Sequence, residues 1–368
     1  MPVTYQLIAK QNKARAGIIS TPHGEIETPV FMPVGTQSTV KAMTYAQVND
    51  CGAEITLANT YHLFLRPGAD LIAKAGGLHK WTNFHKPFLT DSGGFQIFSQ
   101  MRINKCRISD DGAEFIDVIT GQKYFMSPED SMNVQNKLGA DIIMAFDHCP
   151  QGNATYEEAK EAMLRTHAWA ERCVKAHART EDQALFLIVQ GGIYEDLRKE
   201  SAAYIASLDV PGYAIGGVSV GESREDIDRI VDYTSPLLPE NKPRYLMGIG
   251  TKEDIVKAIA AGIDMFDCVM PTRIARHGSF FDRDGNRLQI KNQKYTEDFS
   301  PLVEGCNCFT CTNHTKAYVR HLWKVHETTA ATLLSIHNLT YLINLAKEIR
   351  GNIVSGTFNP EKYLISDG

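Results

Sequence analysis

Several features that would direct a chain to a membrane, to export or to disorder are missing from this sequence. No apolar run reaches membrane-spanning length, and the first residues, MPVTYQLIAK, lack the apolar core of a secretion signal. Low-complexity segments, short repeats and long linkers are absent as well. We therefore expect a cytoplasmic globular protein. Cysteines stay reduced in that compartment, so clustered cysteines would indicate a metal site rather than disulfide bonds.

The sequence also has no excess of positive charge, since its formal net charge is −5. The surface as a whole would therefore not attract nucleic acid, and any RNA site must be a local basic patch. The 368 residues are 43% hydrophobic and 22% charged, which is ordinary globular composition. That length suits one large domain or two ordinary ones, with a core that needs no disulfides.

Short apolar runs alternate with longer amphipathic stretches after residue 50, whereas residues 1–50 have the pattern of turns and short strands. The runs cover residues 54–58, 87–90, 141–146, 184–189, 212–215, 244–247 and 263–266, with a candidate eighth run at 287–291. This alternation is typical of βα units on a parallel sheet. It fits a (β/α)8 barrel, and a doubly wound open sheet fits it almost as well.

Polar or glycine residues follow nearly every apolar run at its C-terminal end. They are Asp91, Asp147, Gln190, Gly216 with Gly217, Gly248 and Asp267. In a barrel these ends converge on one face, where barrel active sites form. Any single one of these residues could simply begin a loop, because Gly and Asp are common there. Six positions in register favour the barrel and a shared site.

Three of these residues are aspartates, Asp91, Asp147 and Asp267, and each could also cap the helix that follows it. Their surroundings are unusual for plain caps: paired glycines follow Asp91, Cys149 follows Asp147, and a turn that ends at Arg273 follows Asp267. Carboxylates that converge in a cleft suit chemistry at a sugar carbon, where one attacks the carbon and another moves the leaving-group proton. The residues alone do not separate a glycosyl-transfer enzyme from a sugar hydrolase.

Three cysteines within six residues, Cys306, Cys308 and Cys311, form the strongest local signal. Such spacing is typical of a metal knuckle, and zinc in structural sites takes four tetrahedral ligands, so a fourth is needed. The candidate histidines are His314, His337, and less favourably His321 and His326. His314 is close in local spacing, whereas His337 lies in a helical stretch that could return to close the site.

The cysteines lie in a basic part of the chain. Residues 271–326 carry nine Lys and Arg residues and five acids, so the rest of the chain is correspondingly more acidic. This segregation suggests a phosphate-binding flank beside the metal knuckle. The candidates for RNA contact are Arg273, Arg276, Lys316, Arg320 and Lys324. The last three also have the spacing of a solvated helix face, and both interpretations can hold together.

At this point the chain resembles bacterial tRNA-guanine transglycosylases, the queuine tRNA-ribosyltransferase family, nearly from end to end. The segments that carry the resemblance are TDSGGFQ (90–96), MAFD (144–147), QGG (190–192), IGGVSVGE (215–222), YLMG (245–248), FDCVMPTR (266–273) and the cysteine knuckle. The resemblance implies a (β/α)8 barrel with a small N-terminal antiparallel sheet and an inserted zinc-binding subdomain. It implies N-terminal strands in residues 1–50 that close the barrel, a catalytic barrel in 51–303, the zinc subdomain in 304–337 and a C-terminal helix in 338–368.

The resemblance also implies the roles of individual residues. Asp267 would be the nucleophile on the ribose, and Asp91 the general acid and base. Phe95, where many relatives have Tyr, would stack on the base opposite Met247. The remaining base-binding residues would be Asp147, Cys149, Gln190, Gly216, Gly217, Val218 and Gly248. Cys306, Cys308, Cys311 and His337 would hold one structural zinc, since the family's spacing selects His337 over His314.

The substrates would be guanine, the modified base preQ1 (7-aminomethyl-7-deazaguanine) and a tRNA whose anticodon begins with guanine, and the family usually forms homodimers. A eukaryotic-type enzyme that inserts the larger base queuine is an alternative, but queuine-using relatives have Gly where this chain has Val220. A non-catalytic tRNA-binding subunit is another, although both Asp91 and Asp267 are present. The zinc knuckle beside a basic flank argues against a sugar hydrolase.

Overall fold

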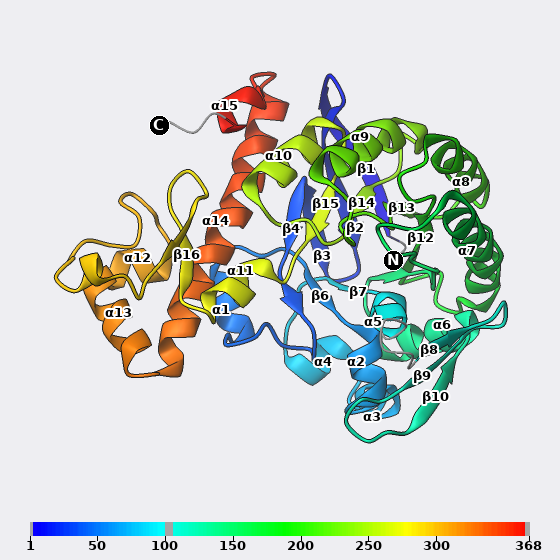
Figure 1. The fold of residues 1–368 in the computed structure, drawn as a ribbon, viewed down its shortest axis with the longest axis horizontal. Coiled ribbons are helices and arrows are strands. Elements are labelled where there is room, and N and C mark those ends of the chain that lie inside the picture. The colour runs from blue at the N-terminus through cyan, green and yellow to red at the C-terminus, as the bar shows by residue number, and fades with distance from the viewer. Residues whose placement is uncertain (1–2, 100–105, 365–368) are drawn as a thin grey trace.

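The computed structural model, which describes residues 3–99 and 106–364, contains a barrel of parallel strands surrounded by helices (Figure 1). A nine-stranded sheet has the order β4-β15-β14-β13-β12-β11-β7-β6-β5. Its strands are β4 (Val30–Met32), β5 (Val34–Gly35), β6 (Thr56–Ala58), β7 (Phe88–Thr90), β11 (Ile142–Met144), β12 (Ala184–Val189), β13 (Gly212–Ile215), β14 (Arg244–Leu246) and β15 (Met265–Asp267). The two end strands, β4 and β5, are separated in sequence only by Pro33, so the sheet closes on itself. The predicted (β/α)8 barrel is confirmed.

Side chains of each barrel strand alternate between two buried layers. In β12, Ala184, Phe186 and Ile188 belong to the cluster inside the barrel, and the intervening residues belong to the cluster between strands and helices. Every residue of β12 is buried, because a strand of a helix-covered barrel has no solvent face. This double burial explains why all seven apolar runs after residue 50 proved to be barrel strands.

The prediction of an eighth barrel strand at residues 287–291 was wrong. Residues of β17 (Arg287–Gln289) pair antiparallel with β16 (Ser279–Phe281) in a two-stranded sheet outside the barrel. β17 is exposed or half-buried along its length, so it could not occupy a barrel position covered on both faces. The eighth position is filled instead by β4 and β5 from the N-terminal segment, which pair with β15 and β6.

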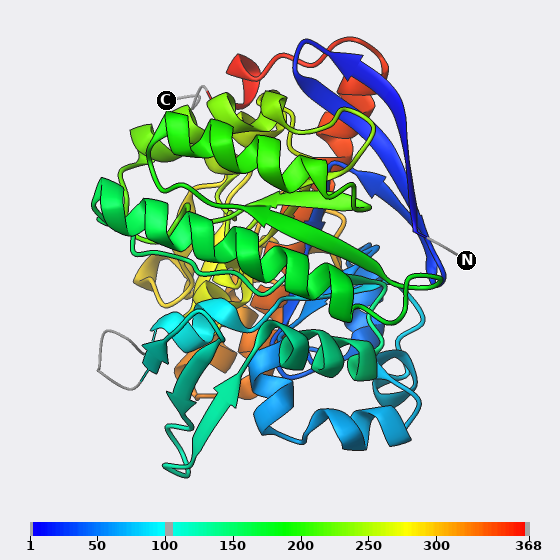
Figure 2. The ribbon, with the colours of Figure 1, turned by 90° about the vertical axis from the view of Figure 1, so that its right-hand side faces the viewer.

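Helices surround the barrel, and Figure 2 shows the green ones, within residues 156–207, lying side by side along its outside. The larger ones are α6 (Pro128–Leu138), α7 (Tyr156–Ala176), α8 (Glu195–Ser207), α9 (Arg224–Thr234) and α10 (Lys252–Ala260). Shorter ones are α1 (Tyr45–Asp50), α2 (Thr60–Leu65), α3 (Ala69–Lys74), α4 (Leu78–Thr82), α5 (Gly94–Ser99) and the 3₁₀ turn η2 (Ser235–Leu237). Capping boxes at Ser127 and Thr155 fix the starts of α6 and α7, as the Ser and Thr before each helix favour.

Two antiparallel sheets lie outside the barrel. One follows α5 and consists of β8 (Cys106–Ile108), β9 (Ala113–Ile116) and β10 (Lys123–Met126). The other is the predicted N-terminal sheet, β1 (Thr4–Gln11), β2 (Ala14–Thr21) and β3 (Gly24–Thr28). Helix α14 (Thr328–Val354) packs against this second sheet, where Arg350 Nη1 donates to the carbonyl oxygens of Gly17 at 2.9 Å and Thr28 at 2.7 Å.

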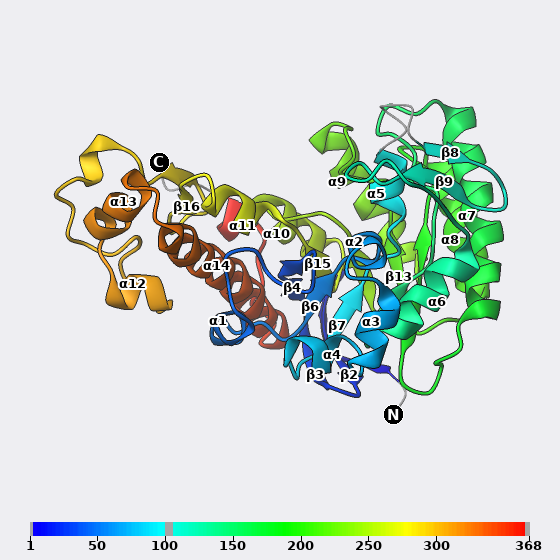
Figure 3. The same ribbon diagram turned by 90° about the horizontal axis from the view of Figure 1, so that it is seen from below.

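The chain after β15 builds a subdomain that projects from one side of the barrel (Figure 3). It contains β16, β17, η3 (Gln293–Tyr295), α12 (Phe309–Asn313) and α13 (Lys316–Lys324). Helices α11 (Met270–Ala275) and α14 connect it to the barrel, and α15 (Glu361–Leu364) packs against α10. Helix α14 runs without interruption through residue 337, so the predicted zinc and C-terminal segments share one helix. None of the helices described has both the length and the apolarity needed to cross a membrane.

Candidate active site

A cavity of about 570 Å³ opens at the C-terminal ends of the barrel strands, where the sequence predicts the site. Its lining includes both predicted catalytic aspartates and all but one of the predicted base-binding residues. These are Asp91, Phe95, Asp147, Cys149, Gly216, Gly217, Val218, Met247, Gly248 and Asp267. The exception, Gln190, lies directly behind the wall and contacts Asp147. The structure thus brings together residues that are spread over 177 positions of the sequence.

Asp267 is the last residue of β15 and is held by two donors. The Tyr245 hydroxyl donates to its Oδ1 at 2.6 Å, and the Gly248 backbone N–H donates to the same oxygen at 3.0 Å. Burial raises the pKa of the Asp267 carboxyl, while these two hydrogen bonds act in the opposite direction. Both hydrogen bonds end on Oδ1, and no hydrogen bond to Oδ2 is found in the described part of the chain. The two donors therefore fix the orientation of the carboxylate through one of its oxygens.

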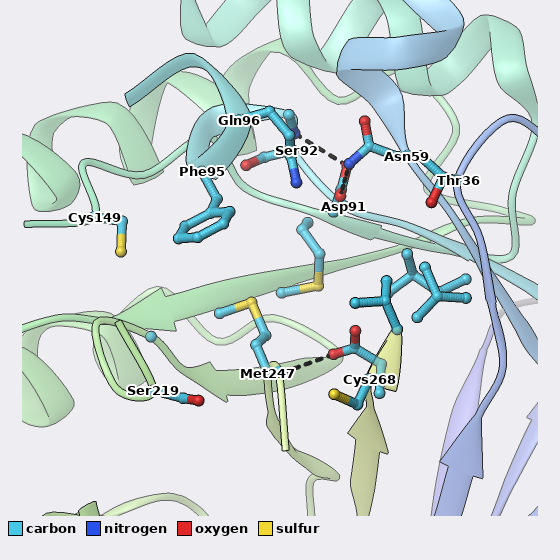
Figure 4. Close-up of a pocket in the computed structure, with 18 of the residues that line it drawn as sticks. Thr36, Asn59, Asp91, Ser92, Phe95, Gln96, Cys149, Ser219, Met247 and Cys268 are labelled. Atoms are coloured by element: carbon cyan, nitrogen blue, oxygen red, sulfur yellow. Dashed lines mark hydrogen bonds between the residues drawn. The ribbon is translucent and has the colours of Figure 1, made fainter. Parts of the chain in front are cut away.

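Asp91 follows β7 on the opposite wall and accepts three hydrogen bonds. They come from the Asn59 side-chain amide, which Figure 4 shows beside Asp91, from the Thr60 N–H at 2.9 Å and from the Gly93 N–H at 3.2 Å. Burial raises the pKa of Asp91 to about 7, the nearby charge of Asp267 adds to the rise, and the three donors oppose it. A carboxyl with a pKa near neutrality can both give and take a proton, as general acid–base catalysis requires.

Asp147 lines the floor of the cavity and forms a polar pair with Gln190 behind it. Gln190 Nε2 donates to Asp147 Oδ2 at 2.6 Å, and burial raises the pKa of Asp147 to about 6 against that bond. Gln190 Oε1 is buried and has no hydrogen-bond partner among the described residues. A Cβ at Gly217 would stand 2.2 Å from this oxygen, and Gly217 has φ +63°, so only glycine fits beside Gln190.

Arg198, on α8, ties this floor together although it does not line the cavity. Its side chain is fully buried and donates to the carbonyl oxygens of Val189 at 2.9 Å, Gly192 at 2.8 Å and Gly216 at 2.7 Å. Burial lowers the pKa of this guanidinium to about 10. One rigid cation therefore fixes both loops that carry Gln190 and Gly217.

Apolar side chains form the upper and lower walls. Figure 4 shows Phe95 and Met247 entering the cavity from opposite sides, with Cys149 at one edge. Phe95 is 53% exposed and lines the cavity, so its ring is accessible to a ligand there. Burial raises the pKa of the Cys149 thiol and raises that of Cys268 to about 11, so neither thiol is suited to nucleophilic attack.

The five predicted RNA-contacting residues divide into two groups. Arg273 and Arg276, in and after α11, line the cavity. Lys316 and Arg320 lie on α13 and make bonds within the protein: Lys316 Nζ donates to Ser300 Oγ at 2.8 Å, and Arg320 Nε donates to the Asn292 carbonyl at 3.0 Å. Lys324 is exposed at the end of the same helix. The structure thus places only the first group at the cavity.

The predicted metal ligands converge in the projecting subdomain. The three Sγ atoms of Cys306, Cys308 and Cys311 lie 3.7, 3.5 and 3.3 Å from Nδ1 of His337, and the cluster could hold a metal ion. Sulfur and nitrogen ligands of a tetrahedral zinc ion stand about 3.5 Å apart, so the spacing fits such a site. His337 Nε2 donates to the Phe281 carbonyl at 2.8 Å, which leaves Nδ1 free to bind an ion.

His314, the histidine nearest to the cysteines in sequence, lies outside the metal cluster. The His314 ring stacks on Tyr318 with a centroid distance of 5.2 Å and does not join the cysteine cluster. His314 directly follows α12, whereas the long α14 brings His337 to the cysteines.

Sequence reasoning missed three residues of the site: Tyr245, Asn59 and Arg198. Tyr245 and Asn59 gave no individual signal, because a strand tyrosine and an asparagine before a helix have common structural uses. Arg198 did give one. It lies on the buried face of α8 together with Leu197 and Ile205, and a charged residue on an apolar helix face indicates a specific partner.

Comparison with known proteins agrees with this geometry. The family model of queuine tRNA-ribosyltransferase matches residues 10–363. A queuine tRNA-ribosyltransferase of Fusobacterium nucleatum is 54% identical over 368 residues, covering 99% of this chain and 98% of that protein. A Macrococcus caseolyticus relative of the same name is 55% identical over 350 residues (95% and 92%), and one from Listeria monocytogenes 52% over 354 residues (96% and 93%). The chain therefore belongs to the queuine tRNA-ribosyltransferase family of glycosyltransferases.

Proposed function

We propose that the protein exchanges the guanine at the first anticodon position of a tRNA for preQ1, through a covalent bond between Asp267 and the ribose. The observation that carries this proposal is the pairing of two unlike carboxyls in one cavity. Asp267 is oriented by donors on one oxygen, and Asp91 has a pKa of about 7. Two carboxyls whose surroundings give them different proton affinities suit a nucleophile and an acid–base catalyst.

The reaction would proceed in two displacements. The ionised Asp267 attacks the anomeric carbon, the bond to guanine breaks, and Asp91 gives its proton to the departing base. The incoming base then loses a proton to Asp91 and attacks the same carbon, which releases Asp267. Each displacement inverts the anomeric carbon, so the product keeps the configuration of the substrate.

The cavity walls support recognition of a planar purine-like base. Phe95 and Met247 would cover the two faces of its ring, as their entry from opposite sides favours. Asp147 and the Gly217 N–H, both at the cavity, would bind its edge together with Gln190, which holds Asp147 in place.

The turn at residues 218–222 would select the small base preQ1. Val220 lines the cavity, and its backbone N–H donates to Glu222 Oε2 at 2.7 Å, which holds the turn in place. A cyclopentene-diol substituent would have to displace the Val220 side chain, and overpacking of this kind costs roughly 1–3 kcal/mol. The aminomethyl group of preQ1 is small and could donate to the Val218 carbonyl.

Competition between the two bases tests this selection. Wild type should replace labelled guanine in tRNA with preQ1 in preference to queuine, and Val220→Gly should gain activity with queuine. Equal use of both bases by the wild type would contradict the steric argument.

The metal cluster would hold one structural zinc. The ion would stabilise the subdomain by joining its segments and would take no part in the exchange of bases. Its thiolate ligands require a reducing compartment, consistent with the cytoplasm. Arg273 and Arg276 at the cavity, with Lys316, Arg320 and Lys324 on α13, would bind tRNA phosphates. We further expect a homodimer.

Incorporation of labelled guanine into an unmodified tRNA tests the proposed activity. Wild type should incorporate it, and Asp91→Asn should reduce the rate by about 10²–10⁴-fold, because an acid–base catalyst is lost. Asp111→Asn, a substitution of an exposed aspartate outside the cavity, is the matched control and should retain activity. If wild-type protein bound tRNA without exchanging guanine, the non-catalytic alternative would replace this proposal.

A further inference from the structure

A buried glutamine of helix α6 binds the backbone next to the proposed active site. Gln135 is fully buried, and its side-chain amide uses all four of its hydrogen-bonding positions. Oε1 accepts from the Met144 N–H at 3.0 Å and from Thr90 Oγ1 at 2.9 Å. Nε2 donates to the Met144 carbonyl at 2.9 Å and to Ser131 Oγ at 3.1 Å. These bonds fix the amide in one orientation.

The amide of Gln135 lies where two neighbouring barrel strands part. β7 and β11 run side by side as far as the pair of Thr90 with Ile143. At the next residue they diverge, since the Asp91 N–H donates to a carbonyl of β6 at 3.2 Å, whereas Met144 lies opposite a residue of β12. The N–H and the carbonyl of Met144 are both bonded to Gln135, because buried backbone groups need partners. Gln135 thus occupies the place that β7 would have beside Met144.

Both chain neighbours of Asp91 are held from α6. Thr90, which precedes Asp91, donates its hydroxyl to Gln135. Ser92, which follows Asp91, accepts at its carbonyl from the Ser131 hydroxyl at 3.0 Å. Ser131 is itself fully buried and accepts from Gln135, so the two bonds belong to one network. Satisfying the backbone of β11 would not require bonds on both sides of Asp91.

The same network reaches the strand that leads to Asp147. Met144 lines the cavity and lies three residues before Asp147. We propose that Gln135 is a positioning residue for the exchange of bases: by occupying the place of β7 beside Met144, it fixes Asp91 relative to Asp147. The inference rests on the proposed function, in which the base contacts both carboxyls. A misplacement of about 1 Å in such a site can lower the rate about 100-fold.

Guanine exchange by two variants tests the proposal. Gln135→Met keeps the length of the side chain and removes its hydrogen bonds, so kcat/KM should fall about 10- to 100-fold. The alkaline limb of kcat/KM should also move to higher pH, because a displaced Asp91 would lose the donors that oppose the rise of its pKa caused by burial. Thr90→Val removes one hydroxyl at nearly constant volume and should cause a smaller change in the same direction. It decides the question if Gln135→Met does not fold.

Two control variants make the same chemical changes away from the cavity. Gln183→Met replaces a buried glutamine that donates to the Ala140 carbonyl at 2.7 Å, before the start of β11. Thr56→Val removes a buried hydroxyl at the start of β6 that has no partner among the described residues. Both controls should keep the alkaline limb of the wild type. A limb that stays in place in Gln135→Met and Thr90→Val, or that moves equally in the controls, would overturn the proposal.

A crystal structure of Gln135→Met or Thr90→Val gives a result that does not depend on activity. Asp91 should be displaced, and its hydrogen bonds from the Thr60 and Gly93 N–H groups should lengthen or break. An Asp91 that keeps its wild-type position and hydrogen bonds would overturn the proposal. If the wild type failed to exchange guanine, the proposed function would be contradicted, and this structure alone would decide whether Gln135 positions Asp91.

Discussion

Replacing Tyr245 by phenylalanine removes the hydroxyl that donates to Asp267 Oδ1 at 2.6 Å and changes little else, because the ring stays in the barrel core. Burial, followed by the charge of Asp267, raises the pKa of Tyr245 well above its usual value, so the hydroxyl remains a donor at every working pH. A hydrogen bond to a charged group contributes about 1.5–3 kcal/mol, which corresponds to roughly 1–2 pKa units of the acceptor. The Gly248 N–H, at 3.0 Å, would remain as the donor to that oxygen.

The sign of the effect follows from the protonation state that attack requires. Asp267 must be ionised, and loss of the donor raises its pKa, so the acid limb of the kcat/KM profile should move to higher pH by about 1–2 units. At alkaline pH the carboxyl is ionised in both proteins, and their rates should converge. The alkaline limb, which we assign to Asp91 with its pKa of about 7, should stay in place because Asp91 must be protonated to expel guanine.

The assay is guanine exchange into tRNA, measured as kcat/KM across the acid and alkaline limbs. Tyr213→Phe is the matched control. Tyr213 is a buried tyrosine of the adjacent strand β13, and its hydroxyl donates to the Ala206 carbonyl at 3.3 Å, away from the cavity. An unshifted acid limb in Tyr245→Phe, or an equal shift in the control, would refute the role given to this hydrogen bond.

Three further predictions concern the metal cluster, the cavity floor and the far end of the barrel. Zinc content should be about one ion per chain, lost in His337→Ala and kept in His314→Ala; the reverse pattern, by elemental analysis, would contradict the ligand set. Arg198→Lys should raise KM for guanine about tenfold or more with a smaller change in kcat, since a lysine cannot bind all three carbonyls; a kcat effect alone would exclude a positioning role. Burial would raise the pKa of Asp141, but hydrogen bonds from His23 and His79 hold that pKa below the usual range. The ionised Asp141 therefore stabilises the fold at pH values above the ordinary carboxyl pKa, and this stabilisation is lost as the pH falls through the lowered pKa of the folded protein. Urea unfolding should therefore show Asp141→Asn less stable by roughly 1–3 kcal/mol at neutral pH, with a smaller difference in acid; a constant difference would contradict the pKa argument.

The barrel could be predicted from the sequence because its strands are buried on both faces and therefore appear as short apolar runs. The exception is instructive. The eighth position consists of β4 and β5 on either side of Pro33, and a proline argues against a central strand, while the segment at 287–291 forms part of a hairpin outside the barrel. Pairing with β15 and β6 depends on tertiary closure, which no local pattern records.

The cavity could be predicted in part for a related reason. Asp91, Asp147 and Asp267 each lie at or just after the C-terminal end of a barrel strand, and parallel strands bring such positions to one face. The hydrogen bonds that distinguish Asp91 from Asp267 come from Asn59, Tyr245 and backbone N–H groups on other strands and loops. Their effect on proton affinity depends on three-dimensional proximity and burial, which sequence spacing does not contain.

The most direct test of the proposed chemistry is to locate the covalent bond. Wild-type protein mixed with tRNA and quenched in denaturant should yield a protein–tRNA adduct, and peptide mapping after nuclease digestion should place the ribose on Asp267. Asp267→Asn should still bind tRNA and yield no adduct, because an amide cannot replace the carboxylate nucleophile. An adduct in Asp267→Asn, or a ribose mapped to Asp91 in the wild type, would contradict the account.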